Sequence, residues 1–419
     1  MENKIYLCID LKCFFASVEC VERHLDPFSV NLVVADSARG NGTICLAISP
    51  RMKELGVNNR CRMFEIPKNI QYIVAKPRMK KYIEYSANIY SIYLKYVSEE
   101  DILVYSIDEC FLDITSYLKM YKLDYFQLTK KIIDDIYETT GICATAGIGT
   151  NLFLAKVALD ITAKHVPEHI GFLNEEKFKE QIWHHRPITD IWNVGHGIAA
   201  RLAKHGCFDL YDVSCLDEKI LYKEFGVNAE FLIDHSKGIE PCTIKEVHNY
   251  HSKSNSLSNS QVLFEDYDFD SALIVLKEMV DINVLDLVDK HLVTNSISLG
   301  VGYSKDACKP VGVSMKLDEY TNSYKLLNKY FVELFQKSVI RNYPIRRIGI
   351  GFNNVIDESY RTINLFTDIE EEQKEHKVQE VIIDIKKKYG KNAILKGMNL
   401  QEKATARVRN KLIGGHNGE

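Results

Sequence analysis

Residues 9–19 read IDLKCFFASVE and residues 106–115 read SIDECFLDIT, and these two stretches decide the fold. In the first, an apolar run over residues 5–9 stops at Asp10, and the apolar residues that follow recur with helical spacing. In the second, an apolar strand over residues 102–107 meets the adjacent acids Asp108 and Glu109. We therefore predict a strand, a turn and a helix beside a second strand, which together deliver three carboxylates to one place.

These carboxylates are the candidate catalytic residues. A single aspartate at a strand end usually caps a turn, but the pair Asp108 and Glu109 is more informative, because neighbouring carboxylates repel each other unless a cation lies near them. Ligation by oxygen alone favours Mg²⁺, with Mn²⁺ as a substitute, over zinc. In the predicted two-metal site for phosphoryl transfer, Asp10 and Asp108 bridge both ions. Glu109 completes the ion at the attacking hydroxyl, and the carbonyl of Leu11 helps to hold the ion on a triphosphate.

Four further residues are candidates for binding the nucleotide. Lys156 follows the glycine-assisted turn of GIGTNLFLAK (147–156), and Lys53 lies in a small strand-and-helix insertion between the two acidic strands. As point charges they would bind the β- and γ-phosphates, although an isolated lysine is more often only a surface residue. The amides of Phe14 and Phe15 begin a helix and could bind phosphate oxygens. The ring of Phe14 fits a core residue equally well, whereas the ring of Phe15 could lie under the sugar and leave no room for a 2′-hydroxyl.

The composition is that of a folded protein with several domains. The 419 residues exceed what one hydrophobic core usually supports, and 46% of them are apolar and 26% charged. The N-terminus lacks the long apolar region of a signal peptide, and no apolar run reaches the roughly 18 residues of a membrane span. Eleven cysteines without a C-x-x-C pair indicate reduced core thiols in a cytoplasmic protein. A zinc site is the alternative, but the ligand spacing for one is missing.

Charge is informative only locally. The formal net charge of −4 argues mildly against a protein that coats nucleic acid by bulk charge. Between residues 386 and 411, however, nine Lys/Arg face the single acid Glu402. This density indicates either a solvated helix face or a contact with DNA.

Later segments indicate further domains. A helical region begins near Gly171 and contains WNVGHG (192–197), in which Gly195 and Gly197 open a helix. The polar, serine-rich segment 247–260 has the composition of a linker. Strand-like runs such as SISLGVGY and IRRIGIGF then alternate with helical runs, which predicts a second small α+β domain followed by a charged helix and a basic tail.

Four motifs resemble those of the Y-family translesion DNA polymerases, in particular the UmuC-like branch of Gram-positive bacteria, of the UvrX type. They are IDLKCFFASVE (9–19), SIDECFLDIT (106–115), GIGTNLFLAK (147–156) and WNVGHG (192–197), and the likeness spans nearly the whole chain. The resemblance implies an α+β fold with a right-hand architecture: a ferredoxin-like palm, small fingers, a helical thumb with a helix-hairpin-helix and a separate α+β little finger. The boundaries that follow are 1–22 and 77–170 for the palm, 23–76 for the fingers, 171–242 for the thumb, 243–260 for a linker, 261–361 for the little finger, and 362–419 for a clamp-motif-like segment with the basic tail.

The resemblance also implies an activity and its partners. It implies error-prone, template-directed synthesis from deoxynucleotides on a primer–template, in the DNA damage (SOS) response, by a cytoplasmic monomer that uses two Mg²⁺ ions. Phe15 would be the steric gate against ribonucleotides. Val194, Gly195 and Gly197 would grip the DNA backbone through main-chain amides, which would explain DNA binding without a basic net charge. A sliding clamp and a recombinase filament or UmuD-like protein are further candidate partners.

The chain departs from the family pattern in the turn and in the fingers. Lys12 stands where DinB-like members carry a second acid, but that position is not a metal ligand in the family, so the predicted metal site is intact. Ser49-Pro50 replaces an Asn-Tyr pair that touches the triphosphate in many members, and Lys53 stands where some have Arg. The nucleotide contacts of the fingers therefore stay open.

The sequence TINLF (362–366) resembles the short motif by which such polymerases dock on the sliding clamp, with Ile363, Leu365 and Phe366 as the contact residues. Thr362 replaces the usual leading glutamine, so a plain amphipathic turn is the alternative. Two other functions use parts of the same pattern: a nucleotidyl cyclase shares the palm chemistry without a grip on DNA, and a catalytically silent DNA-binding repair partner would not need all three carboxylates.

Overall fold

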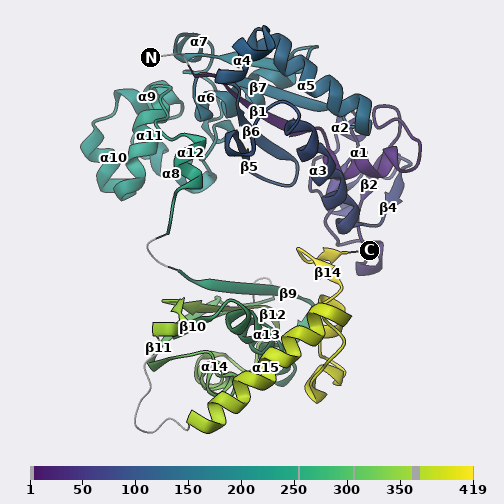
Figure 1. Ribbon diagram of the computed structural model, residues 1–419, viewed down its shortest axis with the longest axis vertical. Helices are drawn as coiled ribbons and strands as arrows, with labels where there is room; N and C mark the ends of the chain where they lie inside the picture. The colour runs from purple at the N-terminus through teal and green to yellow at the C-terminus, as the bar shows by residue number, and fades with distance from the viewer. Residues whose placement is uncertain (1–3, 253–254, 305–306, 361–368, 419) are drawn as a thin grey trace. The chain divides into compact units, whose positions relative to one another are not determined.

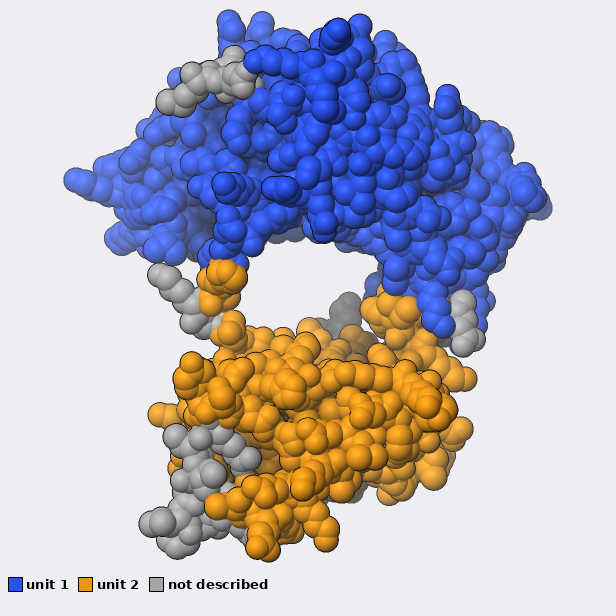
Figure 2. All heavy atoms as spheres, viewed as in Figure 1, with its two compact units in different colours: residues 1–250, 419 blue, residues 251–418 orange. Residues whose placement is uncertain are grey.

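The computed structural model describes residues 4–252, 255–304, 307–360 and 369–418. The chain divides into two compact units, residues 1–250 and residues 251–418 (Figure 2). Each unit has its own sheet and its own hydrophobic core (Figure 1). The predicted clamp-binding residues Ile363, Leu365 and Phe366 lie outside the described residues.

The first unit is built on a five-stranded sheet in the order β5-β6-β1-β7-β8. Strands β7 and β8 are parallel, and the other neighbours are antiparallel. Side chains alternate along β1, so that Leu7 and Ile9 face one core and Tyr6 and Cys8 face another. The strands are β1 (Tyr6–Leu11), β5 (Ile102–Val104), β6 (Glu109–Asp113), β7 (Ala144–Gly149) and β8 (Ile170–Leu173), and the helices that pack on them include α1 (Phe14–Val21), α3 (Met79–Tyr93), α4 (Thr115–Tyr121), α5 (Tyr125–Thr140) and α6 (Leu152–Val157).

Helix α6 approaches the sheet closely because two glycines of β7 lack side chains. A Cβ added at Gly147 or at Gly149 would lie 2.1 Å from a backbone atom of Ala155. The side chain of Asn151 caps the helix by accepting a hydrogen bond from the amide of Leu154 at 2.8 Å. After α6 the chain continues through a π-helical turn, η4 (Ala158–Thr162), and a 3₁₀ turn, η5 (Ala163–His165).

Two smaller layers complete the first unit. A three-stranded sheet in the order β3-β2-β4, with its own small core, forms the insertion between β1 and α3. Its elements are β2 (Leu32–Val34), η1 (Ser37–Arg39), β3 (Ala47–Ile48), α2 (Pro50–Glu54), η2 (Met63–Glu65) and β4 (Ile73–Ala75). A helical region follows β8 and comprises α7 (Glu175–Gln181), η6 (Ile188–Asp190), α8 (His196–Ala203), α9 (Leu210–Cys215), α10 (Glu218–Phe225), η7 (Gly226–Asn228), α11 (Ala229–Ser236) and α12 (Ile244–His248).

The second unit is an antiparallel sheet in the order β11-β10-β12-β9, with helices packed on one face (Figure 1). The other face carries small residues, among them Ser260, Gly300 and Gly349, around an open hollow of about 620 Å³. The elements are β9 (Leu257–Tyr267), α13 (Phe269–Asp289), β10 (Leu292–Tyr303), β11 (Val311–Thr321), α14 (Tyr324–Ser338), β12 (Ile345–Asn353), β13 (Ile356–Asp357), η8 (Glu358–Tyr360), α15 (Ile369–Tyr389), η9 (Gly397–Leu400), α16 (Ala406–Arg409), β14 (Leu412–Ile413) and β15 (His416–Asn417).

The structure shortens the linker predicted over residues 243–260. Helix α12 occupies its start, because Thr243 and Glu246 form a capping box in which each side chain accepts the other's backbone amide. Strand β9 begins at Leu257 and pairs with β12, so the serines at its start belong to the sheet. The polar residues of the predicted linker therefore belong in part to a helix cap and in part to an edge strand.

Candidate active site

Strand pairing brings the three predicted carboxylates together. In the antiparallel register of β1 with β6, Asp10 lies directly opposite Glu109. The amide of Leu11 donates a hydrogen bond to the carbonyl of Asp108 at 2.9 Å, which continues the pairing by one residue. The acids therefore meet at one end of two neighbouring strands, as the sequence indicated.

The electrostatics at Asp10 fit a cation site. Burial, and then the charges of Asp108 and Glu109, raise the pKa of the Asp10 carboxyl to about 7. A carboxylate held among like charges becomes favourable when a divalent cation neutralises it. Among the described residues, no group of three or more His, Cys, Asp and Glu side chains is arranged so that it could by itself hold a metal ion. The three carboxylates are nevertheless hard oxygen donors, and a substrate phosphate is expected to complete the coordination.

Two of the acids are oriented by fixed partners. The hydroxyl of Ser106 donates to Oδ1 of Asp108 at 2.6 Å. Oε1 of Glu109 accepts a hydrogen bond from the thiol of Cys8 at 3.0 Å and forms an ion pair with Nζ of Lys156 at 2.8 Å. Burial, and then the charge of Glu109, raise the pKa of Cys8 well above its ordinary value, so the thiol stays protonated and serves as a donor.

Lys156 is buried and already paired with acidic side chains, unlike a solvent-exposed lysine that could bind a triphosphate directly. Its side chain is 10% exposed and pairs with Glu109 and, at 3.0 Å, with Asp160 of the π-helical turn. Burial lowers the pKa of Lys156, but Asp160 and Glu109 outweigh burial and raise it above its ordinary value. The structure therefore shows Lys156 as a charged support beneath Glu109, and its contact with phosphate stays a prediction.

Lys164 is a cation that the sequence interpretation missed. It pairs with Asp160 at 3.2 Å, its side chain is 51% exposed, and its charge lowers the pKa of Asp10 more than that of Lys156 does. It is thus near the acids and still open to solvent. The signal in the sequence was the spacing of Lys156, Asp160 and Lys164, which recur every four residues.

The two phenylalanines after the turn have separate roles. Phe14 is 2% exposed and belongs to the core under the sheet, as its alternative interpretation had it. The ring of Phe15 is partly buried and stacks on Tyr82, with centroids 4.5 Å apart and planes at 22°. The hydroxyl of Tyr82 donates to the buried carboxylate of Glu19 at 2.8 Å, and Arg78 holds the same carboxylate at 3.0 Å. The ring of Phe15 therefore packs on Tyr82, a side chain that Glu19 holds in place.

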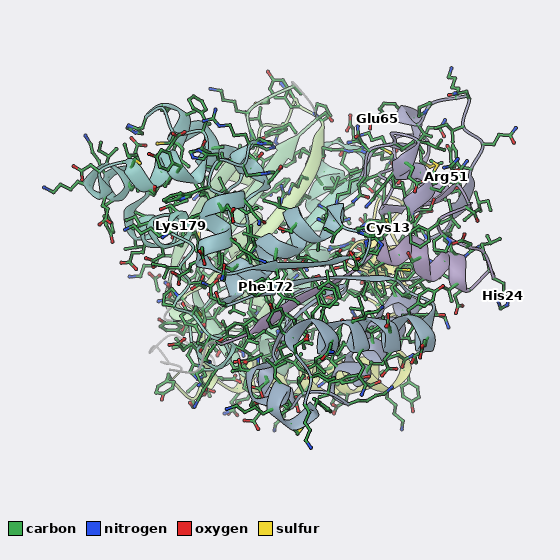
Figure 3. All side chains as sticks on the ribbon, turned by 90° about the horizontal axis from the view of Figure 1, so that it is seen from above. Cys13, His24, Arg51, Glu65, Phe172 and Lys179 are labelled. Atoms are coloured by element: carbon green, nitrogen blue, oxygen red, sulfur yellow. The ribbon has the colours of Figure 1, made fainter. Side chains whose placement is uncertain are left out.

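The small insertion brings Lys53 to the same turn. Cys13 is the N-cap of α1, with a left-handed φ of 51°, and in the view of Figure 3 it lies between Phe172 of β8 and Arg51 of α2. Burial raises the pKa of the Cys13 thiol, and a side-chain contact from Lys53 partly offsets that rise. Lys53 is thus close to the turn that carries Asp10.

Ser49 has a structural function in the insertion. Its hydroxyl donates to the carbonyl of Val30 at 2.7 Å and accepts from the amides of Leu32 and Met52 at 3.2 and 3.4 Å. The side chain is fully buried and caps α2. At this position the chain therefore has a buried helix cap.

The predicted DNA grip is at the start of α8. Val194 is 4% exposed and anchors the turn in the helical core. Gly195 is the N-cap of α8, and a Cβ on Gly195 or on Gly197 would meet nothing within 4 Å. The first amides of a helix lack partners inside it, so this bare surface can receive an anion. Its role in binding DNA stays a prediction.

Comparison with known proteins identifies the family. Residues 9–160 match the sequence model of the impB/mucB/samB family, and residues 254–365 match that of its C-terminal domain, which together is more than half of the chain. UvrX of Bacillus subtilis (strain 168), which carries the name of a UV-damage repair protein, is 29% identical over 99% of this chain and 98% of its own. DNA polymerase IV 2 of the same organism is 28% identical over 99% of both chains. A solved Y-family DNA polymerase chimera of Dbh and Dpo4 shares 21% identity, with a TM-score of 0.64 over 84% of this chain and 99% of that chain.

The chain belongs to the Y family of DNA polymerases. The prediction of a mixed α+β fold with a separate C-terminal antiparallel-sheet little finger is confirmed. Membership of the Y family implies the use of a divalent metal and the binding of DNA and deoxynucleotides. Among the described residues, no helix has the length and apolar character needed to cross a bilayer.

Proposed function

We propose that this Y-family chain is an error-prone, template-directed DNA polymerase that extends a primer past damaged template bases, as a cytoplasmic monomer. The observation that carries the proposal is the trio Asp10, Asp108 and Glu109 at paired strand ends, with the pKa of Asp10 raised to about 7 by burial and by its two neighbours. Such a trio is suited to holding Mg²⁺, and Mn²⁺ in its place.

Each residue of the site has a part in the proposed reaction. Two bound ions would lower the pKa of the primer 3′-hydroxyl and neutralise charge on the triphosphate. Ser106 holds Asp108 in one orientation, and Lys156 does the same for Glu109, so both carboxylates are preorganised for ligation. Leu11 would contribute its carbonyl oxygen. The reaction joins the 3′-oxygen to the α-phosphorus and releases pyrophosphate.

The cations that would receive the triphosphate come from two sides. Lys53 reaches the turn from the insertion, and Lys164 approaches from beyond the π-helical turn. Both are point charges suited to the β- and γ-phosphates. The amides of Phe14 and Phe15 begin α1 beside them, and the ring of Phe15 would exclude a 2′-hydroxyl because Tyr82 prevents it from moving away.

Single-nucleotide extension of a primed template tests the proposal. The native chain with Mg²⁺ is expected to add a deoxynucleotide, and Asp108→Ala is expected to abolish the addition while DNA binding persists. Extension from a mismatched primer end is expected to be efficient, as for an error-prone polymerase. A folded, DNA-bound native chain that does not extend the primer would favour the silent repair partner, and turnover of a triphosphate without DNA would favour the cyclase.

Protein partners are part of the proposal but rest on sequence alone. Ile363, Leu365 and Phe366 are proposed to dock on a sliding clamp, and a recombinase filament or a UmuD-like protein is proposed as an activator in the DNA damage response. Pull-down of the purified clamp by the native chain, but not by a chain with Leu365→Ala and Phe366→Ala, would test the first of these contacts.

A further inference from the structure

The last fifty residues of the second unit form an extension beyond the little-finger domain. The family match ends at residue 365, and residues 369–418 add α15, η9, α16, β14 and β15. We call residues 369–418 the C-terminal extension. Helix α15 packs along α13, so the extension is in contact with the little finger over much of its length.

Two carboxylates, one of them buried, fasten the C-terminal extension. Glu278 of α13 is 2% exposed and accepts hydrogen bonds from the amides of Thr405 and Ala406 at 2.7 and 3.1 Å and from Nδ2 of Asn399 at 2.9 Å. Glu375 of α15 accepts from the hydroxyl of Ser323 at 2.6 Å, at the start of α14. Charge-assisted bonds of this kind are among the stronger ones, so the extension is a fixed part of the unit.

Four basic residues of the extension form contacts that attach it to the rest of the unit. Lys387 pairs with Asp289, Lys396 with Asp281 at 2.6 Å, and Lys403 with Glu265 at 2.5 Å. Burial lowers the pKa of Arg409, whose guanidinium donates to Asn259 of β9 at 3.4 Å. These four cations serve the folding of the extension.

Three other cations gather on the surface instead. Nδ2 of Asn392 donates to the carbonyl of Arg407 at 3.1 Å, and Nδ2 of Asn410 donates to the carbonyl of Lys391 at 3.4 Å and to Oδ1 of Asn392 at 2.8 Å. Lys391, Arg407 and Lys411 are therefore brought into one neighbourhood, and all three are exposed. We call these three residues the basic cluster. Within the part of the chain that the structure describes, none of its members forms a salt bridge.

A cluster of this kind is unfavourable without an anionic partner. Arg407 lies in α16 and Lys411 lies in the turn that follows it, so their like charges repel each other. The asparagine bonds hold Lys391 beside them nevertheless. The fold thus keeps three positive charges together on a segment that is otherwise neutralised.

The basic cluster lies next to the edge of the sheet. The extension is bonded to the edge strand β9, where Nε2 of Gln261 donates to the hydroxyl of Thr405 at 3.0 Å. Helix α16, which carries Arg407, also contacts α13, where Glu278 accepts hydrogen bonds from the amides of Thr405 and Ala406. The basic cluster therefore lies where the extension meets both the edge strand β9 and helix α13.

We infer that the basic cluster, Lys391, Arg407 and Lys411, is a contact for phosphates of the DNA backbone. The inference rests on the proposed polymerase function. A net charge of −4 argues mildly against holding DNA by bulk charge, so local clusters are the candidate phosphate contacts, and this one has no salt-bridge partner among the described residues. A contact to the backbone is independent of sequence, which suits an enzyme that must remain on damaged templates.

Salt dependence of DNA binding tests the inference. The dissociation constant of the full chain for a fluorescent primer–template is measured by anisotropy over a range of KCl concentrations, for the wild type and for Arg407→Gln/Lys411→Gln. Each lost phosphate contact removes about 0.9 from the slope of log affinity against log salt, so the double variant is expected to lose roughly 2. Its affinity at low salt should fall as well, and its thermal unfolding should be unchanged because both side chains are exposed.

A matched control comes from the same extension. Lys374 and Lys377 are exposed on α15, on the helical side of the unit, and Lys374→Gln/Lys377→Gln makes the same change in net charge. The control is expected to keep the wild-type slope, and Arg407→Lys/Lys411→Arg should keep it too. If the two glutamine variants have the same slope, the inference is wrong and an acidic protein becomes the partner to test. If the wild type itself does not bind the primer–template, the proposed function fails together with the inference.

Discussion

Removal of the Asp10 charge is expected to stabilise the metal-free protein. The pKa of Asp10 is raised from 3.8 to about 7, first by burial and then by Asp108 and Glu109. A group whose pKa is raised on folding contributes stability that is fully present below the unfolded pKa, near 4, and is lost as the pH rises through about 7. At about 1.4 kcal/mol per pKa unit, the total loss is about 4 kcal/mol. Between pH 5 and pH 8 the same linkage gives about 2–3 kcal/mol.

The assay compares Asp10→Asn with the wild type in urea, with EDTA present, at several pH values. Trp183 and Trp192 are the two tryptophans of the chain, and both lie in the first unit, so their fluorescence reports the unit that holds the site. The variant should gain stability over the wild type as the pH rises from 5 to 8. Titrating groups that do not interact with Asp10 contribute equally to both proteins and cancel in the difference.

Mg²⁺ should reverse the order. The ionised Asp10 of the wild type is expected to bind the cation, so added Mg²⁺ should raise the stability of the wild type at pH 8 more than that of Asp10→Asn. A difference between the two proteins that stays constant within about 0.5 kcal/mol from pH 5 to pH 8 would refute the reasoning, because the pKa of Asp10 would then be ordinary.

The remaining predictions concern the groups around these acids. Because Lys156 orients Glu109, Lys156→Met should lower kcat for nucleotide addition at least about tenfold, with little change in the KM for the deoxynucleotide. Lys164→Met should instead raise the KM for the deoxynucleotide. The reverse pattern in steady-state kinetics would exchange the roles of the two lysines. Phe15→Ala should raise the incorporation of ribonucleotides relative to deoxynucleotides by at least about tenfold, and Tyr82→Ala should do so more weakly; equal discrimination in both variants and the wild type would show that the ring is not the gate. Glu278→Gln should destabilise the second unit by about 2 kcal/mol and speed amide hydrogen exchange over residues 404–418, since the carboxylate holds the amides of Thr405 and Ala406; unchanged exchange there would contradict the anchoring role.

The acidic trio could be predicted from the sequence because two strong local signals agree. Asp10 closes the apolar run of β1 as predicted, whereas the strand predicted over residues 102–107 ends at Val104 and Glu109 begins the next strand, β6. The pairing of β1 with β6 still places the acids side by side. In the register with Asp10 opposite Glu109, Leu7 and Ile9 face one core, and a shift by one residue would exchange them with the side chains of the other core. The sequence left the ring of Phe14 open between a core residue and a site residue, and the structure places it in the core.

The C-terminal extension could not be placed from its composition. Nine basic residues with one acid are typical of a solvated or DNA-binding surface, yet Lys387, Lys396 and Lys403 find their partners on α13 and β9. Those partners lie more than 90 residues earlier in the chain, and only the packed sheet and helix bring them near. Composition likewise did not reveal the capping box at the start of the predicted linker, where Thr243 and Glu246 bond to each other's backbone.

The division of labour between Lys156 and Lys164 depends on a detail of the backbone. In a regular α-helix, residues 156, 160 and 164 would form one row, and both lysines would face the same surroundings. The π-helical turn over Ala158–Thr162 changes the rotation between them, and turns of this kind are common at functional sites. Lys156 consequently lies 10% exposed against Glu109, whereas Lys164 is 51% exposed and still close enough to affect Asp10. Asp160 pairs with both lysines, and it therefore links Lys156, which supports Glu109, to Lys164, which we propose for the triphosphate. Removal of the Asp160 carboxylate should disturb both functions at once.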